Sequence, residues 1–489
     1  MKRELFRDLI FYEIYPTSFY DSNNDGVGDL KGIIEKLDYI KDLGFNGIWL
    51  NPFYDSPFMD GGYDVRDFYK VDKRFGTNDD FKLLCAKAKE MGIKIIVDLV
   101  PGHASEENKE FLRSAEFERN ECSDMFIFSD SAWNMDSRYR FVSGRHNRDG
   151  NYMINFFSCQ PAFNYGFKNV SSPSWQLSYK DERTFKTRDY IVSVMKYWCS
   201  LGASGFRVDM ADSLVKDDDD LKSATREVWD YIFSKVKKDY PDIYVVSEIG
   251  LPNRSFRMGF DADFMLDFHD SSYIKTFIRS EDNVLLKKKN INKFVEELKY
   301  AYKCSSELGG YIANVSGNHD ECRISTLAKD KLKTFYLFIL SLPGTPFIYY
   351  GDEIGMEYTP NISKNGGYNR TGSRTPMQWD NSKNLGFSKS DNIYLPVGEA
   401  NKNNVQDMIN DKNSIYHYLK DLIRFRNSSK ALKSDSIEIE LVDNVLYIKR
   451  EELTFVLNLK DEDIHLNNDI IFTSGSGNIL KPSEAALIN

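Results

Sequence analysis

The stretch GFRVDMAD, residues 205–212, has the pattern of a buried strand but carries full charges. By the two-residue period of a strand, Phe206 and Val208 form one apolar face, and Arg207 and Asp209 lie on the opposite face. A charge inside a buried strand is costly unless it is paired, hydrogen-bonded or used in function. We therefore expect this strand to end in a functional site.

Short apolar strands of this kind alternate with helical patterns along most of the chain. Strands that are apolar almost throughout and are separated by helices indicate a parallel sheet. Eight such strands predict the α/β fold class and a (β/α)8 barrel. The expected helices include residues 32–44, 79–92, 187–202 and 221–240. The expected strands are residues 9–16, 45–52, 93–100, 205–210, 242–248, 262–268, 311–317 and 346–352.

Two parts of the chain depart from this alternation. Residues 104–170 are polar and aromatic with no clear helix, which predicts a small domain inserted after the third strand. After about residue 426, short alternating runs such as SIEIELVDNVLYIKREELTFVLNL predict an antiparallel β-domain. We assign the barrel to residues 1–103 and 171–425, the inserted domain to residues 104–170 and the C-terminal β-domain to residues 426–489.

The composition argues against several classes of protein. The chain has 489 residues and a net charge of −10, which disfavours a nucleic-acid partner. Its best candidate for a membrane span, FYLFILSLPGTPFIYY, is interrupted by Pro343, Gly344 and Pro346. The first residues, MKRELFRDLI, contain no apolar signal core, so we expect a cytoplasmic location. The six cysteines form no CxxC pair, which disfavours zinc and predicts free thiols in a reducing compartment.

Charged side chains recur at the predicted strand ends. In a (β/α)8 barrel the functional side chains gather at the carboxyl ends of the strands. Like charges are costly to bring together and are seldom kept for stability alone. We therefore expect one functional rim, formed by Asp98, His103, Arg207, Asp209, Glu248, Asn318, His319 and Asp320.

Two of these carboxylates suit the cleavage of a glycosidic bond. Asp209 would be the nucleophile, kept ionised by Arg207, and Glu248 would be the proton donor, its pKa raised by nearby negative charge and partial burial. A carboxylate pair that acts in this way is the chemistry of retaining glycoside cleavage, through a covalent glycosyl-enzyme. The sequence does not give the separation of the two carboxyl groups, so retention is open at this point.

The motifs at these positions resemble those of the α-amylase superfamily, glycoside hydrolase family 13, over nearly the whole chain. The resemblance implies a barrel, an inserted domain after strand three and a C-terminal β-sandwich. It also implies that Asp209 is the nucleophile, Glu248 the general acid/base, and Asp320 a third carboxylate that grips the sugar hydroxyls. The motifs are, in order, DLVPGH (98–103), QPAFN (160–164), GFRVDMAD (205–212), VSEIG (246–250) and GNHDECR (317–323).

The same resemblance implies further substrate-binding residues. His103, Arg207 and His319 would line the subsite that holds the reacting glucose. Tyr63 and Asp64, in the sequence GGYDVRDFY, resemble the aromatic platform and the hydroxyl clamp of that subsite. For these two residues the alternative is an ordinary polar loop after the second strand.

Other motifs resemble the α-glucosidase and oligo-1,6-glucosidase branch of the superfamily. QPAFN resembles a signature of that branch, with Ala162 in place of an acid, and GSRTPMQWD (372–380) is also typical of it. In that branch Arg374 or a neighbour lies near the pocket mouth, and an arginine at the position of Arg323 is found in many exo-acting enzymes. Met210 stands where a valine is common, which argues against a strict α-1,6 preference.

We therefore expect a retaining α-glucosidase that acts on short α-linked gluco-oligosaccharides or maltodextrins. The alternatives are an endo-acting α-amylase, or a transglycosylase or isomerase of the trehalose synthase-like or sucrose-active kind. A non-catalytic amylase-like partner of a transporter is disfavoured, because the sequence shows no anchor and keeps all three carboxylates. The expected partner is a small-molecule substrate, with no nucleic acid and no membrane. Linkage preference and oligomeric state are left open.

The loop DSNNDGVGD, residues 21–29, predicts one structural Ca²⁺ site. The side-chain oxygens of Asp21, Asn23, Asp25 and Asp29 suit a hard ion that takes roughly six to eight oxygens. The loop is not a full EF-hand, and an ordinary turn without metal is the alternative. Similar loops bind Ca²⁺ in the oligosaccharide-cleaving branch of the family, which favours the ion and adds the Val27 carbonyl as a ligand.

Overall fold

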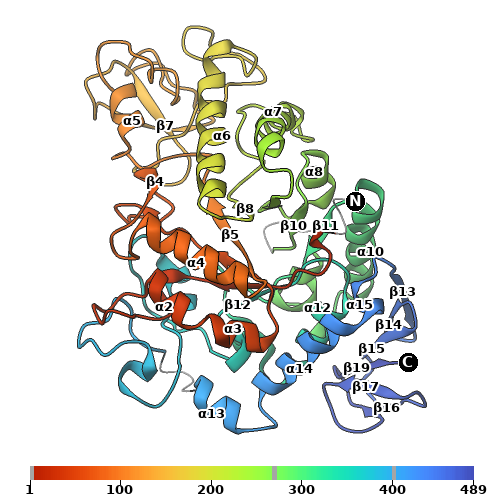
Figure 1. Ribbon diagram of the computed structural model, residues 1–489. Coiled ribbons are helices and arrows are strands. Elements are labelled where there is room, and N and C mark those ends of the chain that lie inside the picture. Colours follow the sequence, from red (N-terminus) through yellow and green to blue (C-terminus); the bar gives the residue numbers. More distant parts are fainter. Residues whose placement is uncertain (1–4, 267–271, 399–402) are drawn as a thin grey trace.

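A barrel of eight parallel strands forms the centre of the molecule (Figure 1). The computed structural model describes residues 5–266, 272–398 and 403–489. Backbone hydrogen bonds from the Phe347 N–H to the Asn314 carbonyl (2.8 Å) and from the Ser316 N–H to the Phe347 carbonyl (3.0 Å) join the last two strands. The predicted (β/α)8 barrel is thereby confirmed. In spatial order the strands are β11 (Tyr311–Ala313), β10 (Ala262–Phe264), β9 (Tyr244–Ser247), β8 (Gly205–Val208), β5 (Lys94–Leu99), β2 (Gly47–Leu50), β1 (Phe11–Ile14) and β12 (Phe347–Tyr349).

The observed strands lie within the eight predicted ranges and are shorter, because residues at both ends leave the ladder. Asp267 and Phe268, at the end of the predicted strand 262–268, lie outside the described residues.

Aromatic rings fill the amino-terminal end of the barrel interior. Phe11, Tyr244 and Phe347 are the first residues of their strands and are fully buried. The rings of Phe11 and Phe347 stack with centroids 4.4 Å apart, and Trp49 packs against Phe264 at 5.2 Å. This apolar filling leaves the opposite, carboxyl-terminal end of the interior to polar side chains. The burial of the rings thus supports the barrel and confines its charged groups to one rim.

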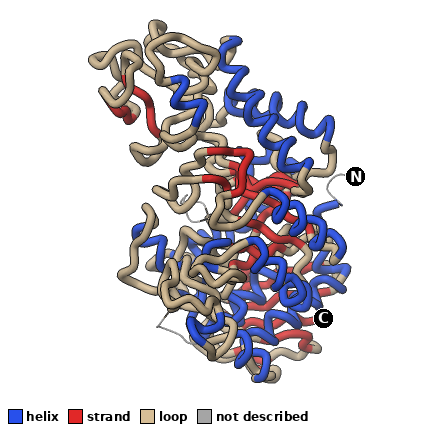
Figure 2. The backbone as a smooth tube through the Cα atoms, turned by 60° about the vertical axis from the view of Figure 1, so that its left-hand side comes forward, coloured by secondary structure: helices blue, strands red, loops and turns tan. Residues whose placement is uncertain are grey.

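Helices cover the outer face of the barrel (Figure 2). The predicted single helix over residues 32–44 is two helices, because the backbone leaves helical geometry at Lys36 (φ −105°, ψ 7°). A capping box formed by Thr77 and Asp80 starts α4. The helices are α2 (Leu30–Glu35), α3 (Leu37–Leu43), α4 (Asn78–Glu90), α6 (Phe185–Ser200), α7 (Ser223–Asp239), α8 (Pro252–Arg257), α9 (Val284–Lys287), α10 (Ile291–Leu308), α11 (Ile324–Ala328), α12 (Leu332–Ser341), α13 (Val405–Asn410), α14 (Ile415–Ser428) and α15 (Lys430–Lys433). Of these helices, none is both long enough and apolar enough to cross a membrane.

The segment 104–170 forms a loop-rich unit at the top of Figure 1. It contains one short helix, α5 (Lys109–Ser114), and one hairpin of β6 (Arg140–Ser143) and β7 (Asn151–Ile154). Phe111 packs edge-on against Phe126, with centroids 5.2 Å apart, and joins the helix to the rest of the unit. The segment was predicted to contain no clear helix, and α5 was missed because its two turns are too short to give a helical period.

The C-terminal part is an antiparallel β-domain, as predicted. Its first strand begins at Glu438, because α14 and α15 continue past the predicted boundary at residue 426. Arg426 is buried at this junction and donates hydrogen bonds to the Leu342 (2.8 Å) and Gly344 (2.9 Å) carbonyls. The main sheet contains β13 (Glu438–Val442), β14 (Val445–Arg450), β15 (Leu453–Asn458), β19 (Ala485–Ile488) and β17 (Ile470–Thr473), and β16 (Ile464–His465) pairs with β18 (Ile479–Leu480).

Two further segments reach the carboxyl-terminal rim of the barrel. A loop with the short strands β3 (Tyr54–Asp55) and β4 (Asp67–Val71) follows β2. A long segment, residues 357–398, follows β12 and contains the 3₁₀ helix η6 (Tyr368–Ser373). A hydrogen bond from the Tyr349 hydroxyl to the Ser373 carbonyl (3.0 Å) ties η6 to the end of β12.

Candidate active site

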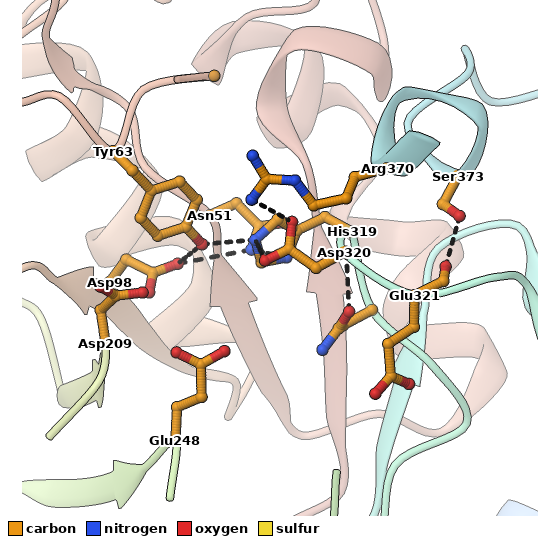
Figure 3. Close-up of polar contacts among 12 residues, drawn as sticks. Asn51, Tyr63, Asp98, Asp209, Glu248, His319, Asp320, Glu321, Arg370 and Ser373 are labelled. Atoms are coloured by element: carbon orange, nitrogen blue, oxygen red, sulfur yellow. Dashed lines mark hydrogen bonds and ion pairs between the residues drawn. The ribbon is translucent and has the colours of Figure 1, made fainter. Parts of the chain in front are cut away.

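Adjacent barrel strands deliver the charged side chains of the site (Figure 3). Arg207 lies in β8, Asp209 follows its last residue, and Glu248 follows the last residue of β9. These strands are neighbours, and Val208 pairs with Ser247 in their parallel register. Because parallel strands end on the same side of a sheet, the two carboxylates meet at one rim.

The Arg207 guanidinium connects three carboxylates. Its Nη1 atom lies 2.7 Å from Asp98 Oδ1 and 3.0 Å from Asp209 Oδ1, and its Nη2 atom forms an ion pair with Glu248. The Arg207 side chain is fully buried. A buried cation is stable only when it is paired, and here it is paired three times. The charges in the GFRVDMAD strand thus belong to one ion cluster.

Burial and neighbouring charges determine which of these carboxyl groups holds a proton. Burial raises the pKa of Glu248 well above its usual range, Arg207 opposes the rise, and the Asp209 and Asp320 charges add to it. Burial also raises the pKa of Asp209, with Arg207 again opposing. The pKa of Asp98 rises to about 6 for the same reason. Glu248 is therefore the group best suited to hold a proton at neutral pH.

Asp320, by contrast, is held ionised. Its carboxylate lies 2.5 Å from Arg374 Nη2 and 3.3 Å from Arg370 Nη1. Burial alone would raise the pKa of Asp320, but the contact with His319 and the positive charges of Arg374 and Arg370 outweigh burial and hold this pKa well below its usual range. The site thus contains one carboxylate fixed as an anion and one carboxyl group poised to carry a proton.

His319 lies beneath this rim between Glu13 of β1 and Tyr63 of the loop that joins β3 to β4. Its Nδ1 is 2.9 Å from Glu13 Oε1, and its Nε2 is 2.6 Å from the Tyr63 hydroxyl. The Tyr63 and His319 rings stack with centroids 5.3 Å apart. Burial lowers the pKa of His319 well below its ordinary value, so the ring is neutral. These contacts fix the orientation of the Tyr63 ring at the cavity.

His103 connects the barrel to the inserted domain. Its Nε2 donates to the Tyr63 carbonyl (3.0 Å), and Asn155 Nδ2 lies 3.2 Å from its Nδ1. Burial lowers the pKa of His103 to about 4. The Lys216 ammonium reaches the same junction, 3.3 Å from Asn155 Oδ1.

The charged groups surround one cavity of about 610 Å³. Ligand pockets typically measure roughly 300–1,000 Å³, so this space is large enough for a sugar ring and part of a second one. Five predicted site residues line it, namely Tyr63, His103, Asp209, Glu248 and Asp320. Arg207, His319 and Arg374 lie behind this lining, buried, and each contacts a residue that lines the cavity.

Two predicted substrate-binding residues do not reach the cavity. Arg323 turns toward the end of β12, where it donates to the Tyr350 carbonyl (2.7 Å) and lies 3.2 Å from Asp352 Oδ1. Asp64 is fully buried and accepts hydrogen bonds from the Met59 (2.8 Å) and Asp60 (3.0 Å) N–H groups. Both side chains therefore form contacts within the protein, and neither residue lines the cavity.

Several lining residues were not predicted from the sequence. Asp60 accepts hydrogen bonds from Arg370 Nη2 (2.7 Å) and Gln160 Nε2 (2.9 Å), and both Asp60 and Arg370 line the cavity. Arg370 stands four residues before Arg374 in the GSRTPMQWD region, and this spacing was the available signal for it. The other unpredicted lining residues are Phe156, Phe157, Asp212, Ile249 and Tyr368.

The predicted calcium loop folds around its own carboxylates. Asp21 accepts hydrogen bonds from the Asn24 (2.7 Å) and Gly26 (2.8 Å) N–H groups, and Asp29 accepts one from the Gly32 N–H (2.7 Å) at the start of α2. No group of three or more His, Cys, Asp or Glu side chains among the described residues is placed to hold a metal. In this structure the Asp21 and Asp29 carboxylates cap the turn.

A barrel whose strand ends bring three carboxylates to one sugar-sized cavity defines a class of enzyme, the glycoside hydrolases. The family model described as "Alpha amylase, catalytic domain" matches residues 13–435, so the chain belongs to the alpha-amylase family.

Curated relatives match most of the chain. An oligo-1,6-glucosidase of Heyndrickxia coagulans is 28% identical over 577 residues and covers 99% of each chain. A trehalose synthase/amylase TreS of Mycolicibacterium smegmatis is 31% identical over 481 residues, 87% of this chain and 77% of its own. An alpha-glucosidase of Apis mellifera is 30% identical over 529 residues, 95% of this chain and 87% of its own.

Solved structures share the fold. A trehalose-6-phosphate hydrolase mutant of Bacillus licheniformis superimposes with a TM-score of 0.80 at 24% identity, covering 98% of both chains. The trehalulose synthase MutB of Pseudomonas mesoacidophila gives a TM-score of 0.81 at 24% identity, covering 99% of both chains. At this level of identity the likeness establishes the architecture alone.

The buried neutral His103 makes stability depend on pH. Its pKa is about 4 in the folded chain, against roughly 6.5 when unfolded, so its contribution is present above pH 6.5 and is lost as the pH falls toward 4. The His103→Gln variant has no group that gains a proton here, so its stability should not fall in this way. We therefore expect the free energy of unfolding of the wild type, relative to the variant, to decrease by about 1–3 kcal/mol between pH 7 and pH 4. Urea unfolding of both proteins at several pH values measures the difference. A constant difference across this range would contradict a neutral buried His103.

Proposed function

We propose that this member of the alpha-amylase family is a retaining, exo-acting α-glucosidase of short α-linked gluco-oligosaccharides or maltodextrins. The observation that carries the proposal is the pair Asp209 and Glu248, bound to the two terminal nitrogens of one guanidinium at a cavity that Asp60 and Arg370 also line. The relatives named oligo-1,6-glucosidase and alpha-glucosidase support it.

The closeness of Asp209 and Glu248 favours retention of anomeric configuration. Both carboxyl groups contact the terminal nitrogens of Arg207. Inverting enzymes hold their carboxyl groups roughly 6.5–9.5 Å apart to admit a water molecule, whereas retaining enzymes hold them about 5–5.5 Å apart. Two carboxyl groups bound to one guanidinium favour the shorter separation, so direct attack by Asp209 is the reaction that we propose.

The chemistry then follows from the protonation states. Glu248 donates its proton to the glycosidic oxygen while an Asp209 oxygen bonds to the anomeric carbon and the bond to the leaving oxygen breaks. Glu248, now a carboxylate, takes a proton from water, and the water oxygen displaces Asp209 from the anomeric carbon. Arg207 favours the ionised form of Asp209, which is the form that attacks.

Asp320 supplies a fixed negative charge on the far side of the sugar ring. Arg374 and Arg370 hold its carboxylate in place, and both arginines stay charged. We assign Asp320 to the hydroxyl groups of the reacting glucose, where an anion also stabilises the positive charge that develops on the ring. Tyr63 provides the flat apolar face for the same ring, and His103 lines the cavity beside it.

The Asp60 cluster supports exo action, because we infer that it closes the cavity beyond Asp320. Asp60, Arg370 and Gln160 come from three separate segments and are hydrogen-bonded to one another beyond Asp320. A chain bound for internal cleavage would have to pass through this cluster. A single terminal glucose, with the rest of the substrate leaving through the open mouth, fits without disturbing it. Met210 lines the mouth near Glu248, and we attribute to its bulk a preference other than strict α-1,6.

Transfer to a sugar acceptor is the second candidate. The relative named trehalose synthase/amylase TreS is 31% identical to this chain. Hydrolysis and transfer share the glycosyl-enzyme intermediate. In hydrolysis water attacks this intermediate, and in transfer a sugar hydroxyl attacks it.

For the location of the enzyme we propose the cytoplasm. All six cysteines are free thiols in the structure, as a reducing compartment would keep them.

The product profile tests the proposed function. With maltose, isomaltose, sucrose, maltotriose and maltoheptaose as substrates, we expect glucose as the first product, released as the α-anomer because two displacements restore the configuration. Proton NMR of the first minutes of reaction reports both product and anomer. Larger oligosaccharides without glucose would overturn exo action, β-glucose would overturn retention, and a new disaccharide without net glucose release would favour the transferase.

Replacing the nucleophile tests the role of Asp209. We expect Asp209→Asn to lower kcat by at least about 10³-fold, because an amide does not form the ester intermediate. The melting temperature should change little, since asparagine keeps the shape of the side chain. Asp189→Asn, an exposed carboxylate on α6, is the matched control and should keep full activity. Substantial turnover by Asp209→Asn would show that another group attacks.

Calcium binding at residues 21–29 stays a proposal, supported by the oxygen-rich composition of the loop. Calorimetric titration of chelator-treated protein with Ca²⁺, and with Mg²⁺ as the control ion, tests it. If the loop rearranges to bind the ion, saturating Ca²⁺ should stabilise the protein by about 2.7 kcal/mol at a hundredfold excess over Kd. Asp21→Asn should abolish the effect. No heat of binding, and an unchanged melting temperature with Ca²⁺, would show that the loop is an ordinary turn.

A further inference from the structure

One carboxylate is buried in β10 without lining the catalytic cavity. Asp263 is the middle residue of this strand and is fully buried. Its neighbours Ala262 and Phe264 belong to the apolar filling of the barrel interior, where the Phe264 ring packs against Trp49. Because side chains alternate along a strand, Asp263 points the other way, into the layer between the sheet and the helices.

The burial of Asp263 is costly, and no cation compensates for it. Among the described residues, no basic side chain forms an ion pair with this carboxylate. Its Oδ2 atom is buried and accepts no hydrogen bond from the described part of the chain. Burial raises the pKa of Asp263 to about 7, and the hydrogen bonds that the carboxylate accepts oppose the rise. A carboxylate without a cation in an apolar layer is seldom kept for stability alone.

The other oxygen of Asp263, Oδ1, accepts three hydrogen bonds, and all three come from residues next to Glu248. The donors are the Ser247 hydroxyl (2.7 Å), the Ile249 N–H (3.2 Å) and the Gly250 N–H (3.2 Å). Ser247 pairs with Asp263 in the parallel register of β9 and β10, and it directly precedes Glu248. One carboxylate oxygen therefore holds the chain on both sides of the proton donor.

The turn that follows Glu248 depends on this acceptor. Ile249 and Gly250 are both buried, and within the described ranges Asp263 is the only hydrogen-bond acceptor of their N–H groups. Gly250 has φ +74°, a left-handed conformation that suits a sharp turn. A buried N–H group without an acceptor is unfavourable. Without Asp263 we therefore expect the turn to move, and Glu248 with it.

The contacts on the opposite side of Glu248 come from β8. The Glu248 N–H donates to the Val208 carbonyl (3.0 Å), and the Met210 N–H donates to Glu248 Oε2 (3.3 Å). Strand β9 lies between β8 and β10 in the barrel. Glu248 is thus held from both neighbouring strands, and Asp263 supplies the contacts from β10.

We propose that Asp263 is the positioning residue of the general acid/base Glu248. It acts through the turn at residues 249–250 and does not touch the substrate. The proposal rests on the proposed α-glucosidase function, in which Glu248 first gives a proton to the leaving oxygen and then takes one from water. Both proton transfers require a precise orientation of Glu248, whereas bond formation by Asp209 does not. Loss of Asp263 should therefore slow the steps that include a proton transfer and leave the other steps nearly unchanged.

Two substrates with the same reacting glucose separate these steps. The leaving oxygen of maltose needs a proton, whereas the fluoride of α-D-glucosyl fluoride departs without one. For Asp263→Asn we expect kcat/KM for maltose to fall about ten- to a hundredfold, a part of the roughly 10²–10⁴-fold that a general acid contributes. The kcat/KM for the fluoride reports only the first step, and it should fall by no more than about threefold, because that step needs no acid.

Added azide gives a second readout. Azide attacks the anomeric carbon of the glycosyl-enzyme without losing a proton, and Asp209 leaves as a carboxylate, so this step needs no base. In Asp263→Asn the attack of water on the intermediate should be slow. Azide should then raise kcat for the fluoride and give α-glucosyl azide, which proton NMR identifies. In the wild type azide should have little effect.

Asp261→Asn is the matched control. Asp261 stands just before β10, and its carboxylate accepts a hydrogen bond from the Val245 N–H (2.9 Å) at the other end of β9, away from the rim. Its replacement should leave the ratio of the two kcat/KM values as in the wild type and should give no response to azide. This control separates the contact beside Glu248 from the general effect of removing a carboxylate between the two strands.

Two further variants grade the effect. Asp263→Ala removes the oxygen that asparagine keeps, so it should lose more maltose activity than Asp263→Asn. Melting temperatures verify folding. If neither variant of Asp263 folds, Ser247→Ala carries the test, because it removes one of the three donors and should show the same pattern with a loss of about three- to tenfold on maltose.

The remaining outcomes count against this role of Asp263. An equal loss with maltose and the fluoride, without a response to azide, would mean that Asp263 only stabilises the fold. No loss with either substrate would mean that Glu248 is held in place without Asp263. If the wild type releases glucose from neither substrate, the proposed function falls, and the role of Asp263 falls with it.

Discussion

The Arg207 guanidinium is the interaction on which the site depends. Asp98, Asp209 and Glu248 converge on this one buried cation, and each has its pKa raised by burial and lowered by Arg207. Without the arginine, three buried carboxyl groups would all be driven toward the neutral form, and no ionised nucleophile would remain. With it, the negative charges outnumber the positive one, so a proton is retained, and Glu248 is the carboxyl group whose surroundings favour holding it. A single cation among several acids thus produces both an anion and an acid at neighbouring positions.

The barrel can hold these buried charges because its interior is divided into an apolar amino-terminal end and a polar carboxyl-terminal end. Rings such as Phe11 and Phe347 fill the amino-terminal end, where burial of apolar surface supplies stability without polar groups. The carboxyl-terminal end is occupied by groups that a stable core would avoid. Glu13 illustrates the cost, because its Oε2 atom is buried and finds no hydrogen-bond partner among the described residues. Its other oxygen orients His319, and through His319 the Tyr63 ring. The unfavourable burial of Glu13 is thus linked to the placement of a residue that faces the substrate.

The parts of this molecule that could be predicted from the sequence are those in which apolar residues follow the regular pattern of a strand or a helix. The eight strands were predicted because they are apolar along their length, and Asp98, Arg207, Asp209 and Glu248 because they stand at strand ends. Asp60 and Phe157 lie in loops, and Tyr368 and Arg370 lie in the short 3₁₀ helix η6, where no period shows which way a side chain turns. Arg323 and Asp64 show the same limit, because a motif gives the position of a residue in the sequence but not the direction in which its side chain points. α5 was missed because two turns of helix are too short to show a period of 3.6 residues.

The division between periodic and loop residues also separates reaction from selectivity. The carboxylates that cleave the bond come from neighbouring strands of one barrel, so their geometry follows from the strand register and resists change. The Asp60 cluster is assembled from the loop after β2 (Asp60), the inserted domain (Gln160) and the segment after β12 (Arg370). At the cavity those three segments meet through side-chain hydrogen bonds, so a substitution in any of them alters the shape of the cavity while leaving Arg207 and its partners in place. Selectivity in this fold is therefore a property of contacts between loops, and it can change without any change in the catalytic strands.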